Sequence, residues 1–239
     1  MDKNYQYNSN QSWEGFSELT GEVKDFLVYI KASGCKGFDC SENSMEILRK
    51  WDETEVVTND SLEKVLNDIS NCRSCGLHEN RTHILFGEGP VNAKLIFVGE
   101  WPGAEDDQQG KPFVGKAGQL LTKIIQAMNL TREDVYICNV MKCRPPVNRK
   151  PYPNEIQSCL PYLRRQINLI RPDFICALGT FAAQTLLETH EPISKLRGDF
   201  HDYEGIRVMP TYHPSYLLQK PERKREVWED MKKLMKEMS

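Results

Sequence analysis

Cysteines with ligand-like spacing are the first residues in this sequence whose types suggest chemistry. The 239 residues include eight cysteines; Cys72 and Cys75 are separated by two residues, and Cys143 and Cys159 form a second, wider pair. The start of the chain, residues 1–6, has neither the basic beginning nor the apolar core of a secretion signal, so a disulfide framework is not expected. The spacing favours four thiolates that bind metal, and tetrahedral zinc or an iron–sulfur cluster would each suit them.

Three further residues of catalytic type stand in or directly after short apolar segments. Glu100 ends the first of these segments, Asn139 lies within the second, and His213 follows the last. A carboxylate can orient water, a carboxamide offers both a donor and an acceptor, and a histidine can donate to a developing negative charge. Each residue also has an ordinary structural interpretation. Their occurrence at the same end of a predicted sheet favours one shared site.

The elements that must position these residues alternate between strand and helix along residues 61–239. This order implies a three-layer α/β sandwich around a central, mostly parallel, four-stranded sheet with helices on both faces. Active sites of such sheets lie past the carboxyl ends of the strands. Pro210 argues against a central place for the last strand, and Ser61 and Asn154 are the expected helix caps. The expected strands are residues 94–100, 135–141, 173–179 and 207–212, and the expected helices are residues 62–72, 118–130, 154–170, 181–187 and 222–238.

Charge is divided unequally along the chain. Residues 1–70 contain 14 Asp and Glu against 7 Lys and Arg, whereas residues 71–239 contain 20 against 24. The second part can therefore approach a polyanion such as DNA, although the whole chain has a net charge of −3. We expect residues 1–60 to form an acidic N-terminal extension, partly helical or disordered, and residues 61–239 to form the main domain. No stretch approaches the roughly 20 apolar residues of a membrane span, and we expect a cytoplasmic protein.

Three motifs resemble those of family 4 uracil-DNA glycosylases. They are GEWPGAEDDQQGKPFVGKAGQLL, YICNVMKCRPPVNRKP and TYHPSYLL, which occur in the family's order, and the likeness covers roughly residues 68–239. The resemblance implies a monomeric enzyme that flips uracil out of single- or double-stranded DNA and hydrolyses its N-glycosidic bond. The abasic site that remains starts base excision repair. No lysine in the motifs is placed as a Schiff-base nucleophile, so we expect direct hydrolysis without strand cleavage.

The same resemblance implies roles for single residues. Phe113 is expected to stack on the base, and Asn139 to read O4 and N3–H of uracil. His213 is expected to hydrogen-bond O2 as negative charge leaves with the base, while Glu100 orients the water or stabilises the sugar cation. The residues expected to bind the substrate are Gly99, Trp101, Gly103, Phe113 and Asn139.

A DNA-contacting surface and a cofactor also follow from the resemblance. Leu217 falls where the superfamily places a wedge leucine, and Ser215 where a hydroxyl meets a phosphate. Further phosphate contacts are expected from Arg81, Lys116, Arg144 and Arg149. The four cysteines with ligand-like spacing hold a [4Fe–4S] cluster in this family, which decides for iron–sulfur over zinc and gives the cluster a structural role.

Trp101 departs from the family pattern, which has alanine or glycine at this position. The indole can stack on the flipped nucleotide or crowd the sugar and the water, and we expect crowding because Phe113 already supplies a stacking ring. One alternative function is therefore a glycosylase for another modified base. A different alternative is a non-catalytic DNA-binding member of the superfamily, attached to a replication or repair protein. The presence of Glu100, Asn139 and His213 together favours an enzyme.

Overall fold

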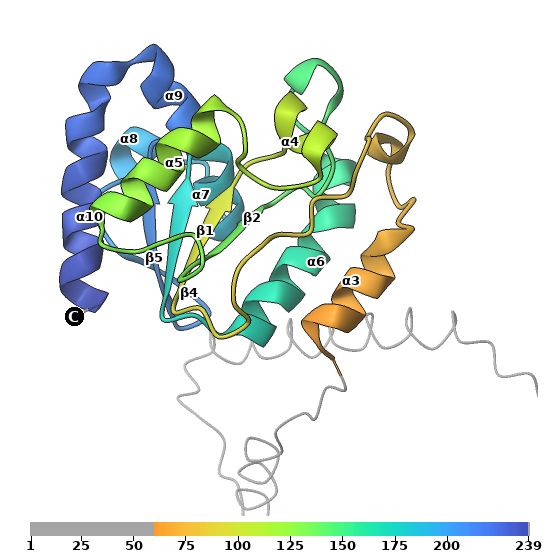
Figure 1. The fold of residues 1–239 in the computed structure, drawn as a ribbon, viewed down its shortest axis with the longest axis horizontal. Helices are drawn as coiled ribbons and strands as arrows, with labels where there is room; N and C mark the ends of the chain where they lie inside the picture. Colours follow the sequence, from red (N-terminus) through yellow and green to blue (C-terminus); the bar gives the residue numbers. More distant parts are fainter. Residues whose placement is uncertain (1–59, 239) are drawn as a thin grey trace, which may run out of the picture. The chain divides into compact units, whose positions relative to one another are not determined.

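The computed structural model describes residues 60–238 (Figure 1). The expected helical segments before residue 60, and with them the predicted extension, lie outside the described residues. No helix in the described range combines the length and the apolar character needed to cross a membrane. The described strands are β1 (Leu95–Gly99), β2 (Tyr136–Asn139), β3 (Phe174–Leu178), β4 (His201–Tyr203) and β5 (Ile206–Thr211). The α-helices are α3 (Leu62–Ser70), α4 (Ala104–Gln109), α5 (Lys116–Ala127), α6 (Pro153–Ile170), α7 (Thr180–Leu186), α8 (Ile193–Leu196), α9 (Pro214–Gln219) and α10 (Lys224–Met238), and the 3-10 turns are η1 (Gly76–Glu79), η2 (Pro146–Asn148) and η3 (Pro221–Arg223).

The described sheet has five strands in the order β2-β1-β3-β5-β4. Strands β1, β2, β3 and β5 are parallel, as predicted, and β4 pairs antiparallel with β5. The α/β class is confirmed, but the expected count of four strands was one short. Three residues are too few to show an alternating pattern, so β4 carries no signal of its own. Its pairing with β5 places it at the edge of the sheet.

Pro210 lies within β5, opposite Ala177 of β3. Pairing with β4 reaches only Val208, so β5 has a single neighbour in the described sheet where the proline stands. A proline costs a ladder hydrogen bond only where its nitrogen faces a partner strand. The early end of β4 therefore makes the proline compatible with a strand that is otherwise central.

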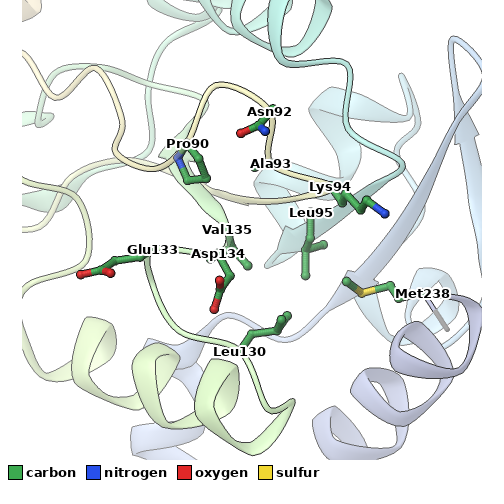
Figure 2. A pocket seen from close by; sticks show the side chains of 10 residues that line it. All are labelled: Pro90, Asn92, Ala93, Lys94, Leu95, Leu130, Glu133, Asp134, Val135 and Met238. Atoms are coloured by element: carbon green, nitrogen blue, oxygen red, sulfur yellow. The ribbon is translucent and has the colours of Figure 1, made fainter.

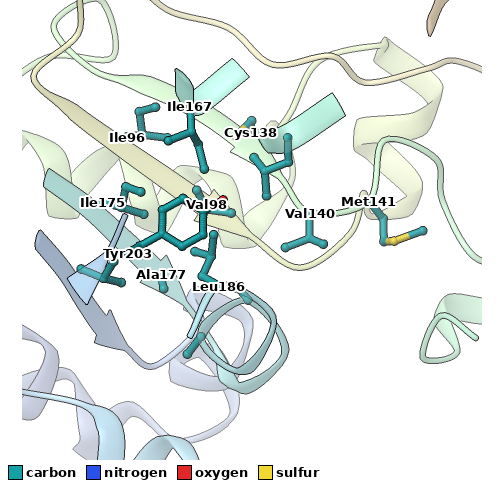
Figure 3. Close-up of a cluster of buried hydrophobic side chains, with 14 of the residues drawn as sticks. Ile96, Val98, Cys138, Val140, Met141, Ile167, Ile175, Ala177, Leu186 and Tyr203 are labelled. Atoms are coloured by element: carbon teal, nitrogen blue, oxygen red, sulfur yellow. The ribbon is translucent and has the colours of Figure 1, made fainter. Parts of the chain in front are cut away.

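Both faces of the sheet are buried, because helices cover each side (Figure 1). Successive strand residues point to opposite faces, so continuous apolar runs supply two separate cores. On one face the strands pack against α6 and α7, as Figure 3 shows for Ile96, Val98, Ile175, Ile167 and Leu186. The other face packs against α5 and α10 through Phe97, Ile137, Met209, Leu121 and Met231. Each such side chain contributes about 1.5–3 kcal/mol on burial, which makes the sheet a rigid base for the loops beyond it.

Helix starts agree with the sequence in one case and differ in another. Ser61 caps α3 as predicted, since its Oγ accepts a hydrogen bond of 3.1 Å from the N–H of Lys64. Asn154 was the expected cap of α6, and this was wrong. The helix begins at Pro153, and the preceding Tyr152 N–H donates to the Glu155 carboxylate at 2.7 Å. A proline in the first turn followed by a glutamate that reaches back is a stronger start signal than a lone asparagine.

Candidate active site at the carboxyl edge of the sheet

Residues of catalytic type meet where the parallel strands end. Gly99 and Asn139 are paired in register as the last residues of β1 and β2. Glu100 follows β1, Gly179 follows β3, and His213 lies two residues after the end of β5. The chain therefore brings the predicted polar residues to one edge of the sheet, as the parallel topology requires.

Gly179 allows Glu100 and His213 to approach one another. Its φ of +95° lies in a region that residues with a side chain rarely adopt. A Cβ at this position would lie 2.5 Å from Oε1 of Glu100 and 3.0 Å from Cβ of His213. Glycine is needed for both reasons. The carboxylate and the histidine thus flank the backbone that enters α7.

Glu100 is held by the first turn of α7. The backbone N–H of Phe181 donates to Oε1 of Glu100 at 3.1 Å. Burial raises the pKa of Glu100, while this N–H and the positive charge of Lys150 act in the opposite direction. A partly desolvated carboxylate fixed by one donor suits a group that orients water or faces a developing cation.

His213 caps α9 with its own side chain. Nδ1 accepts a hydrogen bond of 3.1 Å from the N–H of Ser215, and Oγ of Ser215 lies 2.7 Å from the same nitrogen. Since Nδ1 is an acceptor, the neutral ring carries its proton on Nε2. Burial lowers the pKa of His213 to about 4, with the charge of Asp106 opposing this shift. At neutral pH the ring is an uncharged donor through Nε2.

Asn139 and Phe113 share the space around Gly99. Asn139 is 1% exposed, and its Oδ1 has no hydrogen-bond partner among the described residues. A Cβ on Gly99 would lie 2.5 Å from Cζ of Phe113 and closer still to Oδ1 of Asn139. The Phe113 ring is tilted by 32° to the His213 ring, with centroids 5.7 Å apart. An unpaired buried acceptor beside an aromatic ring is costly unless a ligand supplies the missing donor.

The four cysteines with ligand-like spacing line one small pocket, although they come from three separate segments. Cys72 and Cys75 flank the turn before η1, Cys143 follows β2, and Cys159 lies in α6. Burial raises the pKa of Cys159 to about 12 and also raises that of Cys143. Buried thiols of this kind ionise when a metal replaces the proton.

Lys142 and Arg81 donate hydrogen bonds to two of these thiols. The Lys142 backbone N–H donates to Sγ of Cys159 at 3.2 Å, and Nη1 of Arg81 donates to Sγ of Cys143 at 3.3 Å. Donors to sulfur are typical of iron–sulfur sites, where they tune the cluster. Lys142 is fully buried, and its Nζ donates to the Asn139 carbonyl at 2.8 Å. One lysine therefore connects the thiol pocket to the strand that presents Asn139.

The four thiols form a donor set of the kind that binds zinc or an iron–sulfur cluster. Within residues 60–238, no three His, Cys, Asp or Glu side chains are arranged to hold a metal ion. Zinc would require sulfur atoms about 3.8 Å apart, given Zn–S bonds near 2.3 Å. A [4Fe–4S] cluster separates its thiolates further, because iron and sulfide lie between them. Four thiols around one pocket are the donors that such a cluster needs.

A pocket of about 350 Å³ lies at the opposite edge of the sheet (Figure 2). Lys94 and Leu95 line it at the start of β1, and Val135 lines it just before β2. The amino edge is remote from Glu100 and Asn139, which follow or end these strands. One of its carboxylates, Asp134, accepts hydrogen bonds of 2.7 Å from the Thr131 N–H and hydroxyl, so it is engaged in its own loop.

Comparison with known proteins agrees with the geometry. The sequence model of the Uracil DNA glycosylase superfamily matches residues 86–232. A type-4 uracil-DNA glycosylase of Thermotoga maritima is 45% identical over 183 residues, which cover 74% of this chain and 95% of the relative. Type-4 enzymes of Archaeoglobus fulgidus and Sulfurisphaera tokodaii are each 42% identical, over 73% of this chain and 92% and 84% of the respective relatives.

This chain belongs to the type-4 uracil-DNA glycosylases. The resemblance of its three motifs to that family is confirmed. Membership does not by itself place side chains, and several positions of this glycosylase differ from what the motifs led us to expect.

Of the three arginines expected to contact phosphate, two are engaged inside this glycosylase. Arg81 donates to Cys143 Sγ and, at 2.7 Å, to the carbonyl of Cys72, which places it at the thiol pocket. Arg149 forms two hydrogen bonds of 2.9 and 2.7 Å with the buried Glu155 carboxylate. For Arg149 to bind DNA it would have to break a charged contact with a buried carboxylate, and for Arg81 to do so it would have to give up its bonds to the thiol and the carbonyl. Arg144, whose Nε donates to Oδ1 of Asn148 at 3.0 Å, is the remaining arginine among the candidates.

The expected wedge leucine lies in the core. Leu217 is 1% exposed and belongs to the core under α9, so its side chain does not project from the surface in this structure. A wedge must project from the surface. The neighbouring Leu218 is 45% exposed, and Ser215 on the same short helix is exposed as well. In a short helix one position decides which side chain faces the core, and the sequence alone did not identify it.

Trp101 points to α7. Its ring meets that of Phe181 edge-on, with centroids 5.3 Å apart and an interplanar angle of 72°. The indole packs against the apolar cluster under α6 and α7, whereas Phe113 belongs to the cluster on the other face of the sheet. The crowding of the sugar and the water that we expected from its position in the motif stays a prediction.

Two residues that sequence reasoning missed hold the Phe113 loop. Asp106 accepts hydrogen bonds from the N–H groups of Gly103 at 3.0 Å and Val114 at 2.8 Å, and so ties the turn after β1 to this loop. Arg132 donates to the carbonyl of Phe113 at 3.1 Å. An acidic residue three positions after a turn glycine is a capping signal that could have identified Asp106. Arg132 lies outside all three motifs and had no such signal.

Proposed function

We propose that this protein flips uracil out of DNA and hydrolyses its N-glycosidic bond. The observation that carries the proposal is the meeting of Asn139, His213 and Glu100 at one edge of the sheet. An unpaired buried acceptor, a neutral donor and a desolvated carboxylate are the three groups that this reaction needs. The names of the type-4 relatives support the same activity.

Base recognition follows from the unpaired carboxamide. Oδ1 of Asn139 would accept from N3–H of uracil, and its amide group would donate to O4. Cytosine offers the opposite pattern at these atoms, so the same carboxamide rejects it. Phe113 supplies an apolar face for stacking, which offsets part of the few kcal/mol needed to unstack the base. Uracil would satisfy the acceptor that the folded chain leaves without a partner.

Bond cleavage then depends on charge placement. As the bond between C1′ and N1 breaks, its electron pair moves into the base and builds negative charge on O2. Nε2–H of His213 would donate to this oxygen, and the ring needs no proton from solution because it is neutral. The sugar becomes cationic, and Glu100 would face it while orienting the water that adds to C1′. The water's second proton leaves to solvent, and an abasic site remains.

The four cysteines would hold a [4Fe–4S] cluster, which when bound supplies covalent links among three segments of the chain. These segments are the turn before η1, the loop after β2 and the helix α6. Lys142 and Arg81 would place positive charge and donors beside the thiolates. Because Lys142 also bonds the carbonyl of Asn139, the cluster would stabilise the loop next to the base pocket.

The DNA-facing surface would lie around α9. Ser215 and Arg144 are the candidate phosphate contacts, and Leu218 replaces Leu217 as the proposed wedge. We propose that the protein acts as a monomer on single- or double-stranded DNA. A replication or repair protein partner would bind the acidic N-terminal extension.

A single-turnover assay tests the proposed activity. An oligonucleotide with one uracil would be incubated with excess protein, treated with alkali and resolved by length. We expect cleavage at the uracil position only after alkali, because hydrolysis alone leaves the strand intact. Asn139→Asp should lower the rate at least ~10-fold, because a carboxylate cannot supply the donor to O4. No excision by the parent protein, or equal rates for parent and Asn139→Asp, would contradict the proposal.

A further inference from the structure

The indole of Trp101 is two contacts away from the carboxylate of Glu100. Trp101 meets the ring of Phe181 edge-on at 5.3 Å between centroids. The backbone N–H of the same Phe181 donates to Oε1 of Glu100 at 3.1 Å. The side chain of Phe181 is therefore held by Trp101, while its main chain holds Glu100.

The segment that carries this N–H is the first turn of α7, which is anchored by the buried Ala182 and by the Ala183 N–H, which donates to the Gly179 carbonyl at 3.1 Å. The chain enters α7 through Gly179, whose φ of +95° depends on the absence of a side chain. The Gly179 N–H donates to the carbonyl of Thr211 at 2.9 Å, which fixes the residue before the helix.

The ring of Phe181 packs against the ring of Trp101. Phe181 and Trp101 are both half-buried at the border of one apolar cluster. An edge-to-face aromatic pair fixes the relative position of its two partners more sharply than aliphatic contact does.

We propose that Trp101 is a positioning residue that aligns the Phe181 N–H with Glu100, and that it acts on the reaction through α7 without touching the base. The inference rests on the proposed function, because Glu100 acts on the sugar only if the protein cleaves a glycosidic bond. It also gives the tryptophan a use that alanine or glycine at this position cannot have.

The charges around Glu100 determine how its pKa would change if the hydrogen bond from the Phe181 N–H were weakened. Lys150 faces it from the segment between η2 and α6, and His213 faces it across Gly179. His213 stays neutral because burial lowers its pKa to about 4, so it does not titrate in the range of interest. The Phe181 N–H is the donor from α7, and burial works against it by raising the pKa of Glu100. If that donor moves away, the carboxylate loses a stabilising partner and its pKa rises further.

The expected signature is a shift in the pH profile. An ionised Glu100 is the active form, so the rate falls as the pH drops through the pKa of this group. A raised pKa moves the acidic limb of the profile to higher pH. A tryptophan that merely stabilised the fold would lower the amount of active protein at all pH values and would not move the limb.

The experiment is a double-mutant cycle on the full chain. Single-turnover excision of uracil would be measured from about pH 5 to 9 for the parent, Trp101→Ala, Phe181→Ala and the double variant. We expect each single variant to lose roughly 10-fold in rate at neutral pH. This loss is smaller than the ~10²-fold that a misplacement of about 1 Å costs. The double variant should lose no more than either single variant, the acidic limb should move to higher pH in all three, and affinity for uracil-containing DNA should stay at the parental value.

Conservative and matched variants keep the result interpretable if an alanine variant unfolds. Trp101→Phe retains an aromatic edge and should restore most of the rate and the parental acidic limb. Trp228→Ala removes another partly exposed indole, from α10, and should change neither. Thermal unfolding of each variant would show that the protein is folded at the assay temperature.

Four results would overturn the inference. Additive losses in the cycle would mean that Trp101 acts independently of Phe181. A loss of DNA affinity that matches the loss of rate would mean that the indole contacts the nucleotide. A higher rate in Trp101→Ala would favour the interpretation that the indole crowds the sugar and the water. An unmoved acidic limb would favour a purely structural role. An inactive parent protein would instead refute the proposed function and is distinguishable from all four.

Discussion

Gly99→Ala would place a methyl group in space that two side chains of the base pocket already occupy. The new Cβ would lie 2.5 Å from Cζ of Phe113 and closer to Oδ1 of Asn139. Non-bonded carbon atoms prefer about 3.5–4.0 Å, so the ring and the carboxamide must withdraw by about 1 Å. A misplacement of about 1 Å costs on the order of 10²-fold in rate. We expect the single-turnover rate of uracil excision to fall by this amount.

The assay compares Gly99→Ala with a control substitution at a glycine where an added Cβ would contact no other atom. A Cβ on Gly76 has no atom within 4 Å, so Gly76→Ala controls for the loss of backbone freedom. It should leave the excision rate unchanged. Thermal unfolding would verify that Gly99→Ala is folded under the assay conditions. A folded Gly99→Ala that excises uracil at the parental rate would refute the pocket formed by Phe113 and Asn139.

Four further predictions test the other parts of the site. His213→Ala should lower the single-turnover rate by about 10²–10³-fold with little change in DNA affinity, the usual cost of one donor to a developing anion; an unchanged rate would remove the histidine from the mechanism. The purified protein should be brown, with absorbance near ~400 nm, and Cys143→Ser should lose iron and melt at lower temperature; a colourless protein with stoichiometric zinc would contradict the cluster. Leu218→Ala should slow excision from double-stranded DNA more than from single strands, because only a duplex needs a wedge, and equal losses on both substrates would speak against it. Removal of residues 1–59, which carry 11 acidic and 6 basic residues, should strengthen DNA binding at low salt if Asp60 and its ion pair are kept; equal affinities would show that the segment stays away from the DNA.

Local patterns were sufficient for the parallel strands and for the motifs. A strand buried on both faces must be apolar throughout, so its sequence marks it without reference to any partner. The chain order of strand and helix then implies a parallel sheet, and a parallel sheet brings its carboxyl ends to one edge. For this reason the meeting of Glu100, Asn139 and His213 could be expected before any coordinates. The cysteine spacing likewise predicted that four thiols would meet, and they line one pocket.

Tertiary contacts decided which side chains are free to act. Arg81 and Arg149 look alike in sequence, but one bonds a thiol and the other a buried carboxylate, and both partners are supplied by the folded chain. Leu217 is buried in the core, whereas its neighbour Leu218 is exposed. A side chain's availability depends on neighbours that are distant in sequence, and no local pattern encodes them.

For Trp101 the sequence determines the position in the chain, whereas the tertiary structure decides the direction of the ring. By itself the sequence determined that a large ring follows Glu100 in a turn where the family has a small residue. It could not determine the direction of the ring, because the partner that holds it, Phe181, lies 80 residues later in the chain. Packing against that distant ring turns the indole toward α7. The physical reason is that motif position fixes a Cα, whereas the rotamer of a large side chain is chosen by the surface it can bury.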